Sequence, residues 1–308
     1  MPLCVTTTAC NVLWGVDELS FATPALGGQG PGGSGGDGAG GAGGFGGAGG
    51  TGGGELDCAG EFGAPTPVLA VPGALLASPA ITVGQQELYF SFRADQGADP
   101  EIRRTTRNGS EPFPLGEAVA ELPPMCASPT DLFGFDISAD GLRAYVGCGT
   151  ANGETVVMLA ARSAGGDLPF VQVGPMATAG GSPGVSANEL QVYTTGKASD
   201  APPLVAERGS RNDIFGLAVE VPGLAGLPLR TPAPTPDDLA LFGYVMAATQ
   251  IGYVARSDSQ DSFGPFTPVV TSLLIAASPD VSADCRAVYF VGNEPGGQDP
   301  SVIYVIER

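Results

Sequence analysis

The sequence predicts an all-β protein, a five-bladed β-propeller with four antiparallel strands in each blade. A strand–turn–strand pattern recurs five times, as "SPAITVGQQELYF" at 78–90 and "SPDVSADCRAVYF" at 278–290 show most clearly. The chain is also rich in residues that favour turns, with 49 glycines and 28 prolines among 308 residues. Its 43% of hydrophobic residues still suffice for a large core.

The repeats are aligned on the aromatic residue that ends the second strand of each unit, and the intervals are 56, 48, 49 and 47 residues. The five aromatics are Tyr89, Tyr145, Tyr193, Phe242 and Tyr289. Eleven residues before each aromatic stands a small residue, followed by proline in four units; these residues are Ser78, Gly134, Ser182, Thr231 and Ser278. Apolar and polar residues alternate around the aromatics, as in a half-buried strand. A third strand and an aromatic-led fourth strand complete each unit, which predicts propeller blades.

The predicted blades cover about 77–122, 131–176, 181–222, 231–274 and 276–308. The last unit ends at Arg308, after its third strand. The segment "FGAPTPVLAV" at 62–71 has the aromatic, proline and aliphatic residues of the missing fourth strand. We therefore expect it to pair with residues near 301–307 and to remove a free sheet edge.

Two segments precede the predicted propeller of residues 55–308. Residues 27–54 are almost all glycine and predict a disordered linker, because they have few side chains to offset the entropy of ordering. In residues 1–26, "TTAC" resembles the end of a bacterial lipoprotein signal, although Thr7 stands where leucine is usual. Cys10 would then be the acylated residue. The alternative is an ordinary cysteine in a frayed terminus.

The repeat resembles the WD-like propeller repeat of the TolB family and of many bacterial envelope proteins, with the pattern "SPxxSxDGxxxYF … IYxxxR" over about 62–308. Asp140 and Gly141 keep the Asp-Gly turn, and other residues replace it elsewhere. An arginine ends the third strand of every unit, which predicts a shared structural role such as pairing with a turn carboxylate. The alternative is a ring of arginines that binds a ligand. These arginines are Arg107, Arg162, Arg208, Arg256 and Arg308.

Four cysteines test the predicted layout. Cys126 and Cys148 fall on one face of the second blade, while Cys58 and Cys285 share the opposite face of the last blade. Disulfides Cys126–Cys148 and Cys58–Cys285 are therefore topologically possible, although four cysteines allow three pairings. They would indicate an oxidising, exported setting. None has CxxC spacing, which disfavours a metal site.

Charge and composition exclude several functions. Thirteen basic and 32 acidic side chains give a net charge of −19, so nucleic acids and anionic lipid surfaces would be repelled. The sequence contains no histidine, which excludes Ser-His-Asp and Cys-His catalysis and histidine-ligated zinc.

The inner strands of a propeller line its channel, and only two of the five equivalent inner positions are acidic, Asp136 and Asp280. We expect these carboxylates to accept hydrogen bonds from neighbouring backbone. Alternatively, they bind a cation such as Ca²⁺, or they act as acid and nucleophile of a glycosidase. A five-bladed glycosidase also needs a third inner acidic group and usually aromatic sugar platforms, and Trp14 lies outside the ring.

The sequence thus favours a non-enzymatic, exported and monomeric propeller without a cofactor, located in the periplasm, on the outer membrane or outside the cell. A lipid on Cys10 would provide its sole membrane contact, and one propeller face would bind a protein or an envelope component. The first alternative is a carbohydrate-active hydrolase that uses Asp136 and Asp280. The second is a structural protein without a ligand.

Overall fold

The structure, a computed structural model, describes residues 58–308 apart from the gaps at 96, 120–125, 127–131, 151–154, 164–169, 197, 199, 246–249, 271–275 and 294–301. The chain divides into two units, Met1–Gly53 and Gly54–Arg308, and every described residue belongs to the second. The predicted lipoprotein-like segment with Cys10 and the Gly-rich linker lie outside the described residues.

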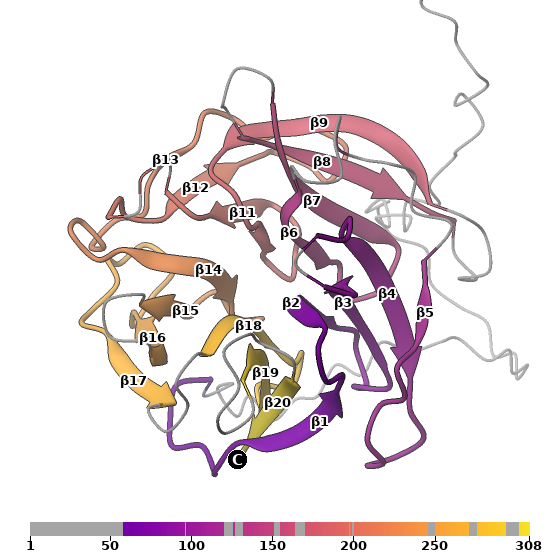
Figure 1. The fold of residues 1–308 in the computed structure, drawn as a ribbon. Helices are drawn as coiled ribbons and strands as arrows, with labels where there is room; N and C mark the ends of the chain where they lie inside the picture. Colours follow the sequence, from indigo (N-terminus) through magenta and orange to yellow (C-terminus); the bar gives the residue numbers. More distant parts are fainter. Residues whose placement is uncertain are drawn as a thin grey trace, which may run out of the picture. The chain divides into compact units, whose positions relative to one another are not determined.

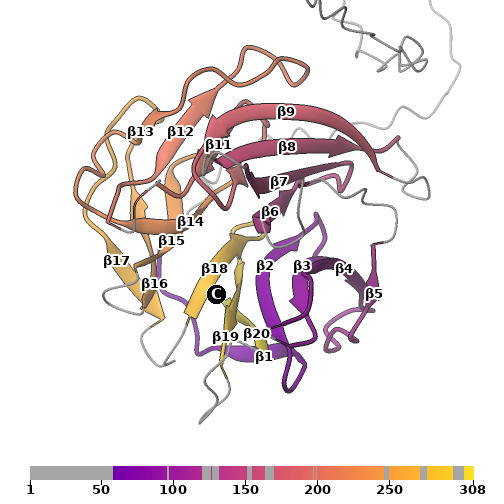
Figure 2. The same ribbon diagram turned by 45° about the horizontal axis from the view of Figure 1, so that its top comes forward.

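Twenty strands form five four-stranded antiparallel sheets around a central axis (Figures 1 and 2). Blade 1 contains β2 (Leu75–Ile81), β3 (Glu87–Arg93), β4 (Glu101–Thr106) and β5 (Glu117–Ala118); blade 2 contains β6 (Leu132–Ile137), β7 (Arg143–Gly149), β8 (Thr155–Ala161) and β9 (Val171–Ala179). Blade 3 contains β10 (Gly184–Val185), β11 (Gln191–Thr194), β12 (Leu204–Glu207) and β13 (Val219–Glu220); blade 4 contains β14 (Leu229–Pro234), β15 (Ala240–Val245), β16 (Gln250–Ala255) and β17 (Thr267–Val270). Blade 5 contains β18 (Ala276–Val281), β19 (Ala287–Gly292), β20 (Val302–Glu307) and β1 (Thr66–Ala70). The predicted fold class is confirmed.

Blade 5 is closed by the N-terminal strand, as the sequence predicts. β1 runs antiparallel to β20, with Thr66 opposite Val305 and Ala70 opposite Val302. Figure 1 shows β1, from the start of the propeller, lying beside β20 at its end. No described segment forms a helix of the length and apolarity needed to cross a bilayer.

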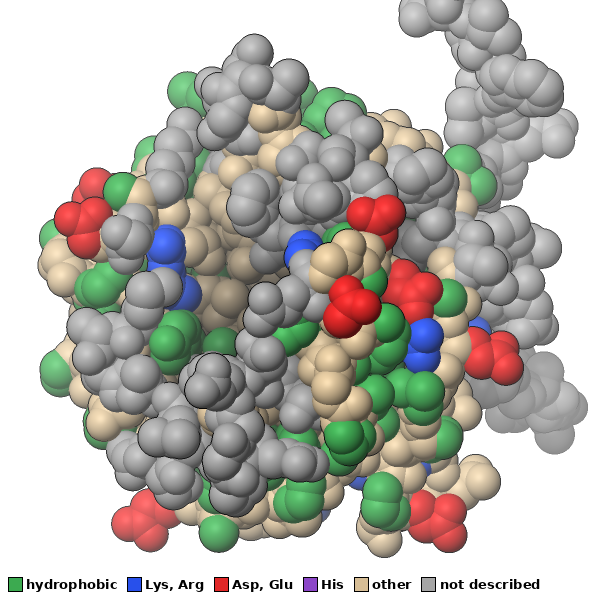
Figure 3. Space-filling view, viewed as in Figure 1, with side chains coloured by type: hydrophobic (Ala, Val, Ile, Leu, Met, Phe, Trp, Pro, Cys, Tyr) green, Lys and Arg blue, Asp and Glu red, His purple; other side chains and the backbone are tan. Residues whose placement is uncertain are grey.

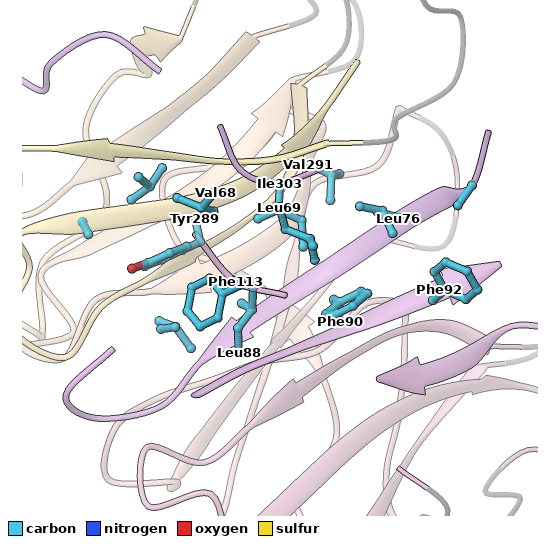
Figure 4. Close-up of a cluster of buried hydrophobic side chains, with 14 residues drawn as sticks. Val68, Leu69, Leu76, Leu88, Phe90, Phe92, Phe113, Tyr289, Val291 and Ile303 are labelled. Atoms are coloured by element: carbon cyan, nitrogen blue, oxygen red, sulfur yellow. The ribbon is translucent and has the colours of Figure 1, made fainter. Parts of the chain in front are cut away.

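The core lies between neighbouring blades. The repeat aromatics were expected to end the second strands, but each is the third residue of its strand, as Tyr89 is in β3. They are almost completely buried, with Tyr89, Tyr145, Phe242 and Tyr289 at 0% exposure. Figure 4 shows one cluster in which Val68 and Leu69 of the closing strand meet side chains of blades 1 and 5. The second strands were also expected to be half-buried, but consecutive residues are buried in β3 and β19, because blades pack against both faces.

Each first turn bends through a left-handed residue four positions before the aromatic. These residues are Gln85, Gly141, Glu189, Asp238 and Cys285, with φ between 55° and 70°. The amide of each donates to the carbonyl oxygen three residues earlier, at 2.7–3.0 Å. Left-handed backbone favours glycine, yet four of the five residues carry side chains. The turn geometry thus survives where the Asp-Gly pattern is lost.

The structure contains two disulfides, Cys58–Cys285 and Cys126–Cys148, which are the two pairings that the predicted topology allows. Cys58–Cys285 ties the segment before the closing strand to the first turn of blade 5. Disulfides persist in oxidising compartments, so the protein is non-cytoplasmic.

Candidate functional site

The inner strands surround a narrow channel whose wall is built by the repeated Ser-Pro and Thr-Pro pairs. At these pairs Ser78, Ser182, Thr231 and Ser278 have φ of 46–51°. The pairing register between the inner strand and the second strand shifts at this point, as between Ala77 and Ala80 in blade 1. The cavity at the axis is about 20 Å³, which holds about one water molecule.

Asp136 and Asp280 both line this cavity, as the sequence predicts for the inner strands. Asp136 Oδ1 accepts the amide hydrogen of Ile137 at 2.7 Å, and its Oδ2 accepts that of Val185, on the next blade, at 2.7 Å. Asp280 Oδ2 accepts the amide hydrogen of Ile81, on blade 1, at 2.6 Å. Each carboxylate therefore connects the inner strands of two adjacent blades while part of its surface faces the channel.

The ionisation of both carboxyl groups is shifted by their surroundings. Burial raises the pKa of Asp136 to about 7, despite the opposing hydrogen bonds from Val185 and Ile137. Burial also raises the pKa of Asp280 well above its usual value, and the negative charge of Asp136 raises it further. Like charges that share a low-dielectric site favour retention of a proton by the pair.

The raised pKa of Asp136 predicts that stability depends on pH. The folded state binds this proton more tightly than the unfolded chain, so the stabilisation is complete below about pH 4 and is lost as the pH rises to about 7. In Asp136→Asn the free energy of unfolding should fall less between these pH values than in the wild type. The upper limit of the difference is about 4 kcal/mol, at 1.36 kcal/mol per pKa unit. Urea denaturation at pH 4.5 and pH 7.5 measures the free energy of unfolding, and Asp99→Asn, at an exposed residue, is the control. The same pH dependence in wild type and Asp136→Asn would contradict the prediction.

The repeated arginines have a structural role; the predicted pairing with a turn carboxylate is found for Arg208 with Glu189 at 3.8 Å, whereas the contact that four blades share is to the turn backbone. In four blades the arginine Nε donates to the carbonyl oxygen of the left-handed turn residue, as from Arg162 to Gly141 at 2.9 Å. All five guanidinium groups lie over a phenylalanine ring of the same blade, at 4.3–4.8 Å from the ring centre. In three blades Nη2 also donates to the tyrosine hydroxyl of the preceding blade. The arginines therefore join blades and do not line the channel.

Sequence reasoning missed a buried acidic residue, Glu189, at the junction of blades 2 and 3. It accepts a hydrogen bond from the Tyr145 hydroxyl at 2.6 Å and forms ion pairs with Arg143 at 3.2 Å and Arg208 at 3.8 Å. Its position four residues before Tyr193 was the available signal. Glu189 does not line the channel, so the cavity wall carries two carboxylates among the described residues.

Metal binding remains a prediction. Among the described residues, no group of three or more acidic, cysteine or histidine side chains could hold a metal ion. Calcium takes six to eight oxygen ligands. An ion at Asp136 and Asp280 would therefore need hydroxyl, carbonyl or water oxygens for most of its coordination.

Figure 3 shows acidic side chains at several places on the visible face, some at its edge and others grouped right of its centre, with basic side chains among them. The predicted protein or envelope partner and the monomeric state remain predictions.

No family model matches the sequence, and no curated protein matches it. Several solved structures share the fold. The GH43_1 enzyme from Xanthomonas citri has a TM-score of 0.56 at 18% identity, over 79% of this chain and 89% of that chain; its xylotriose complex has a TM-score of 0.57 at 17% identity, over 79% and 88%. CoXyl43, a GH43 β-xylosidase/α-arabinofuranosidase from a compost microbial metagenome, has a TM-score of 0.55 at 13% identity, over 79% and 94%.

These structures correct the prediction that the protein is not an enzyme. Identities this low show the shared fold alone, but the structures named above are glycoside hydrolases. A putative TolB from Agrobacterium tumefaciens has a TM-score of 0.44 at 17% identity, over 75% of this chain and 74% of that chain. The comparisons support the propeller fold, and the TolB-type assignment stays a prediction.

Proposed function

We propose that this protein is an exported hydrolase that cleaves glycosidic bonds with Asp136 and Asp280. The observation that carries the proposal is the pair of carboxyl groups in the channel wall. Both have raised pKa values, and the charge of Asp136 contributes to the rise at Asp280. The glycoside hydrolases that share the fold support the same reading. Lipid attachment at Cys10 would keep such an enzyme at the cell envelope and remains a prediction.

Hydrolysis of a glycoside uses two carboxyl groups. The third inner acidic group expected of a five-bladed glycosidase is not among the described residues that line the cavity, so Asp136 and Asp280 would act without it. The protonated carboxyl donates its proton to the glycosidic oxygen as the bond to the anomeric carbon breaks. The ionised carboxylate attacks that carbon, or removes a proton from the water that attacks it. A pair that retains one proton near neutral pH can supply both roles, because one group is acid while the other is base.

The size of the cavity determines how a substrate would approach. A space of about 20 Å³ admits a water molecule but no sugar ring. The sugar would therefore lie at a mouth of the channel. Asp136 and Asp280 each come shortly before a first turn, at 138–141 and 282–285, so the mouth beside these turns is the proposed binding surface. Pentose oligosaccharides are the first substrate class to examine, since xylotriose occupies two of the similar structures.

The proposal predicts that Asp136→Asn and Asp280→Asn each lower hydrolysis by about 10²-fold or more, because general acid–base catalysis contributes 10²–10⁴-fold. Aryl xylosides and aryl arabinofuranosides provide the rate measurement. Asp99→Asn is the matched control, since Asp99 is exposed. The melting temperature of each variant separates lost chemistry from lost folding. Turnover that survives in both channel variants would exclude these carboxyl groups as the catalytic pair.

A further inference from the structure

Three side chains come together at the junctions before blades 1, 3 and 4, and we call them the junction triad. They are the left-handed turn residue of one blade, the arginine that ends its third strand, and the aromatic that belongs to the second strand of the preceding blade. In blade 2 the turn residue is Gly141, which has no side chain, and the aromatic before blade 5 is Phe242, which has no hydroxyl. The backbone part of the junction is constant, because the arginine Nε donates to the turn carbonyl in blades 1 to 4. The side-chain part differs from blade to blade.

The triad of blade 3 is complete. The hydroxyl of Tyr145 donates to Glu189 Oε2 at 2.6 Å, and Arg208 Nη2 donates to the same hydroxyl at 2.8 Å. Every polar group at this junction therefore has a protein partner.

Blade 1 has the same arrangement with an amide instead of a carboxylate. The hydroxyl of Tyr289 donates to Gln85 Oε1 at 2.9 Å, and Arg107 Nη2 donates to that hydroxyl at 2.8 Å. In both complete triads the turn residue has a side chain of glutamate length.

The triad of blade 4 has the same types of group but not the same contacts. Arg256 Nε donates to the carbonyl oxygen of Asp238 at 2.9 Å, as the repeat requires. However, Asp238 Oδ1 and Arg256 Nη2 are buried without a hydrogen-bond partner, the only such side-chain atoms among the described residues. The Tyr193 hydroxyl donates elsewhere, to Gln191 Oε1 at 2.9 Å. Aspartate is one methylene shorter than glutamate and does not complete the triad.

We propose that a water molecule bound at the junction of blades 3 and 4 bridges Asp238 Oδ1 and Arg256 Nη2. The bound species must donate to a carboxylate and accept from a guanidinium, and water does both. An anion would be repelled by Asp238, and a cation by Arg256. Buried polar groups are almost always paired, and internal waters commonly supply the missing partner.

The charges at the junction agree with this assignment. Burial raises the pKa of Asp238 to about 6, and the nearby Arg256 charge opposes that rise. Burial also raises the pKa of Tyr193 to about 12; the charge of Arg256 and its hydrogen bond to Tyr193 oppose this rise, and the charge of Asp238 adds to it. Asp238, Arg256 and Tyr193 therefore interact at one junction.

The backbone permits a longer side chain at this position. Asp238 has φ of 58°, and Glu189 occupies the equivalent position at 60°. Asp238→Glu should therefore displace the water and complete the triad, while Glu189→Asp should open the corresponding space in blade 3. The two substitutions are reciprocal and serve as controls for each other.

High-resolution crystal structures of the wild type and Asp238→Glu test the proposal. We expect an ordered molecule within hydrogen-bond distance of Asp238 Oδ1 and Arg256 Nη2 in the wild type and its loss in Asp238→Glu. The melting temperature should rise by about 2–4 °C in Asp238→Glu and fall by at least as much in Glu189→Asp. Absence of that density from the wild type, or its persistence in Asp238→Glu, would overturn the proposal.

Discussion

A chain that lacks residues 58–70 should not fold. The deletion removes β1 and the Cys58–Cys285 disulfide, and it exposes the full edge of β20. It also removes Val68 and Leu69, which are 7% and 5% exposed and belong to the core between blades 1 and 5. Each buried side chain of this kind contributes about 1.5–3 kcal/mol. Together with the lost pairing, the deficit is similar to the whole stability of a domain, about 5–15 kcal/mol.

A point variant tests the same closure more finely. Leu69→Asp places a charge in the cluster of Figure 4, whereas Thr66→Ala changes an exposed residue of the same strand. Circular dichroism and size-exclusion chromatography should show an unfolded or aggregated Leu69→Asp variant and a native Thr66→Ala variant. A native, cooperative unfolding transition in the deleted chain would mean that the ring does not need its N-terminal strand.

Arg208→Ala should lower the free energy of unfolding by about 3–5 kcal/mol, the usual effect of removing one member of a buried charged network. The Arg208 side chain is 0% exposed. It donates to the Glu189 carbonyl oxygen at 2.7 Å and lies 4.3 Å from the centre of the Phe215 ring. Its removal leaves the buried Glu189 carboxylate with less compensating charge.

Arg211 supplies the matched control for Arg208. It forms an ion pair with Glu189 at 3.6 Å, but its side chain is 48% exposed. Exposed ion pairs contribute about 0–1 kcal/mol, so Arg211→Ala should have a small effect. Urea denaturation of both variants measures the difference. Equal losses for Arg208→Ala and Arg211→Ala would show that burial at the junction is not what makes the arginine important.

The architecture could be predicted because its determinants are local and repeated. The aromatics at Tyr89 and Tyr289 mark equivalent strands, and constant spacing from them locates the inner strands and turns. The closing strand followed from counting strands, since the fifth unit lacked one. The same layout limited the cysteine pairs to those that share a face.

Other features depend on side-chain positions that spacing does not determine. The arginines were expected to pair with turn carboxylates, and Arg208 does so with Glu189. The spacing did not show that the guanidinium also reaches the turn carbonyl and a tyrosine hydroxyl of the preceding blade. Asp238 differs from Glu189 by one methylene, and only the contacts show that one triad is complete and the other is not. The narrowness of the channel likewise depends on how the inner strands pack.

The prediction that the protein is not an enzyme was contradicted by the glycoside hydrolases that share its fold, because the repeat determines a fold that hosts many activities. The same two residues, Asp136 and Asp280, had been assigned mainly to backbone hydrogen bonding, and the structure does contain those bonds. A carboxylate that connects blades can also hold a proton for chemistry. Position alone could not distinguish these roles.

The most direct test of the proposed hydrolysis is the release of pentose from a xylo-oligosaccharide by the wild-type protein, followed by chromatography from pH 4 to pH 9. The proposal predicts turnover that declines above about pH 7, where Asp136 loses its proton. No pentose release from any oligosaccharide of this class at any pH would contradict it.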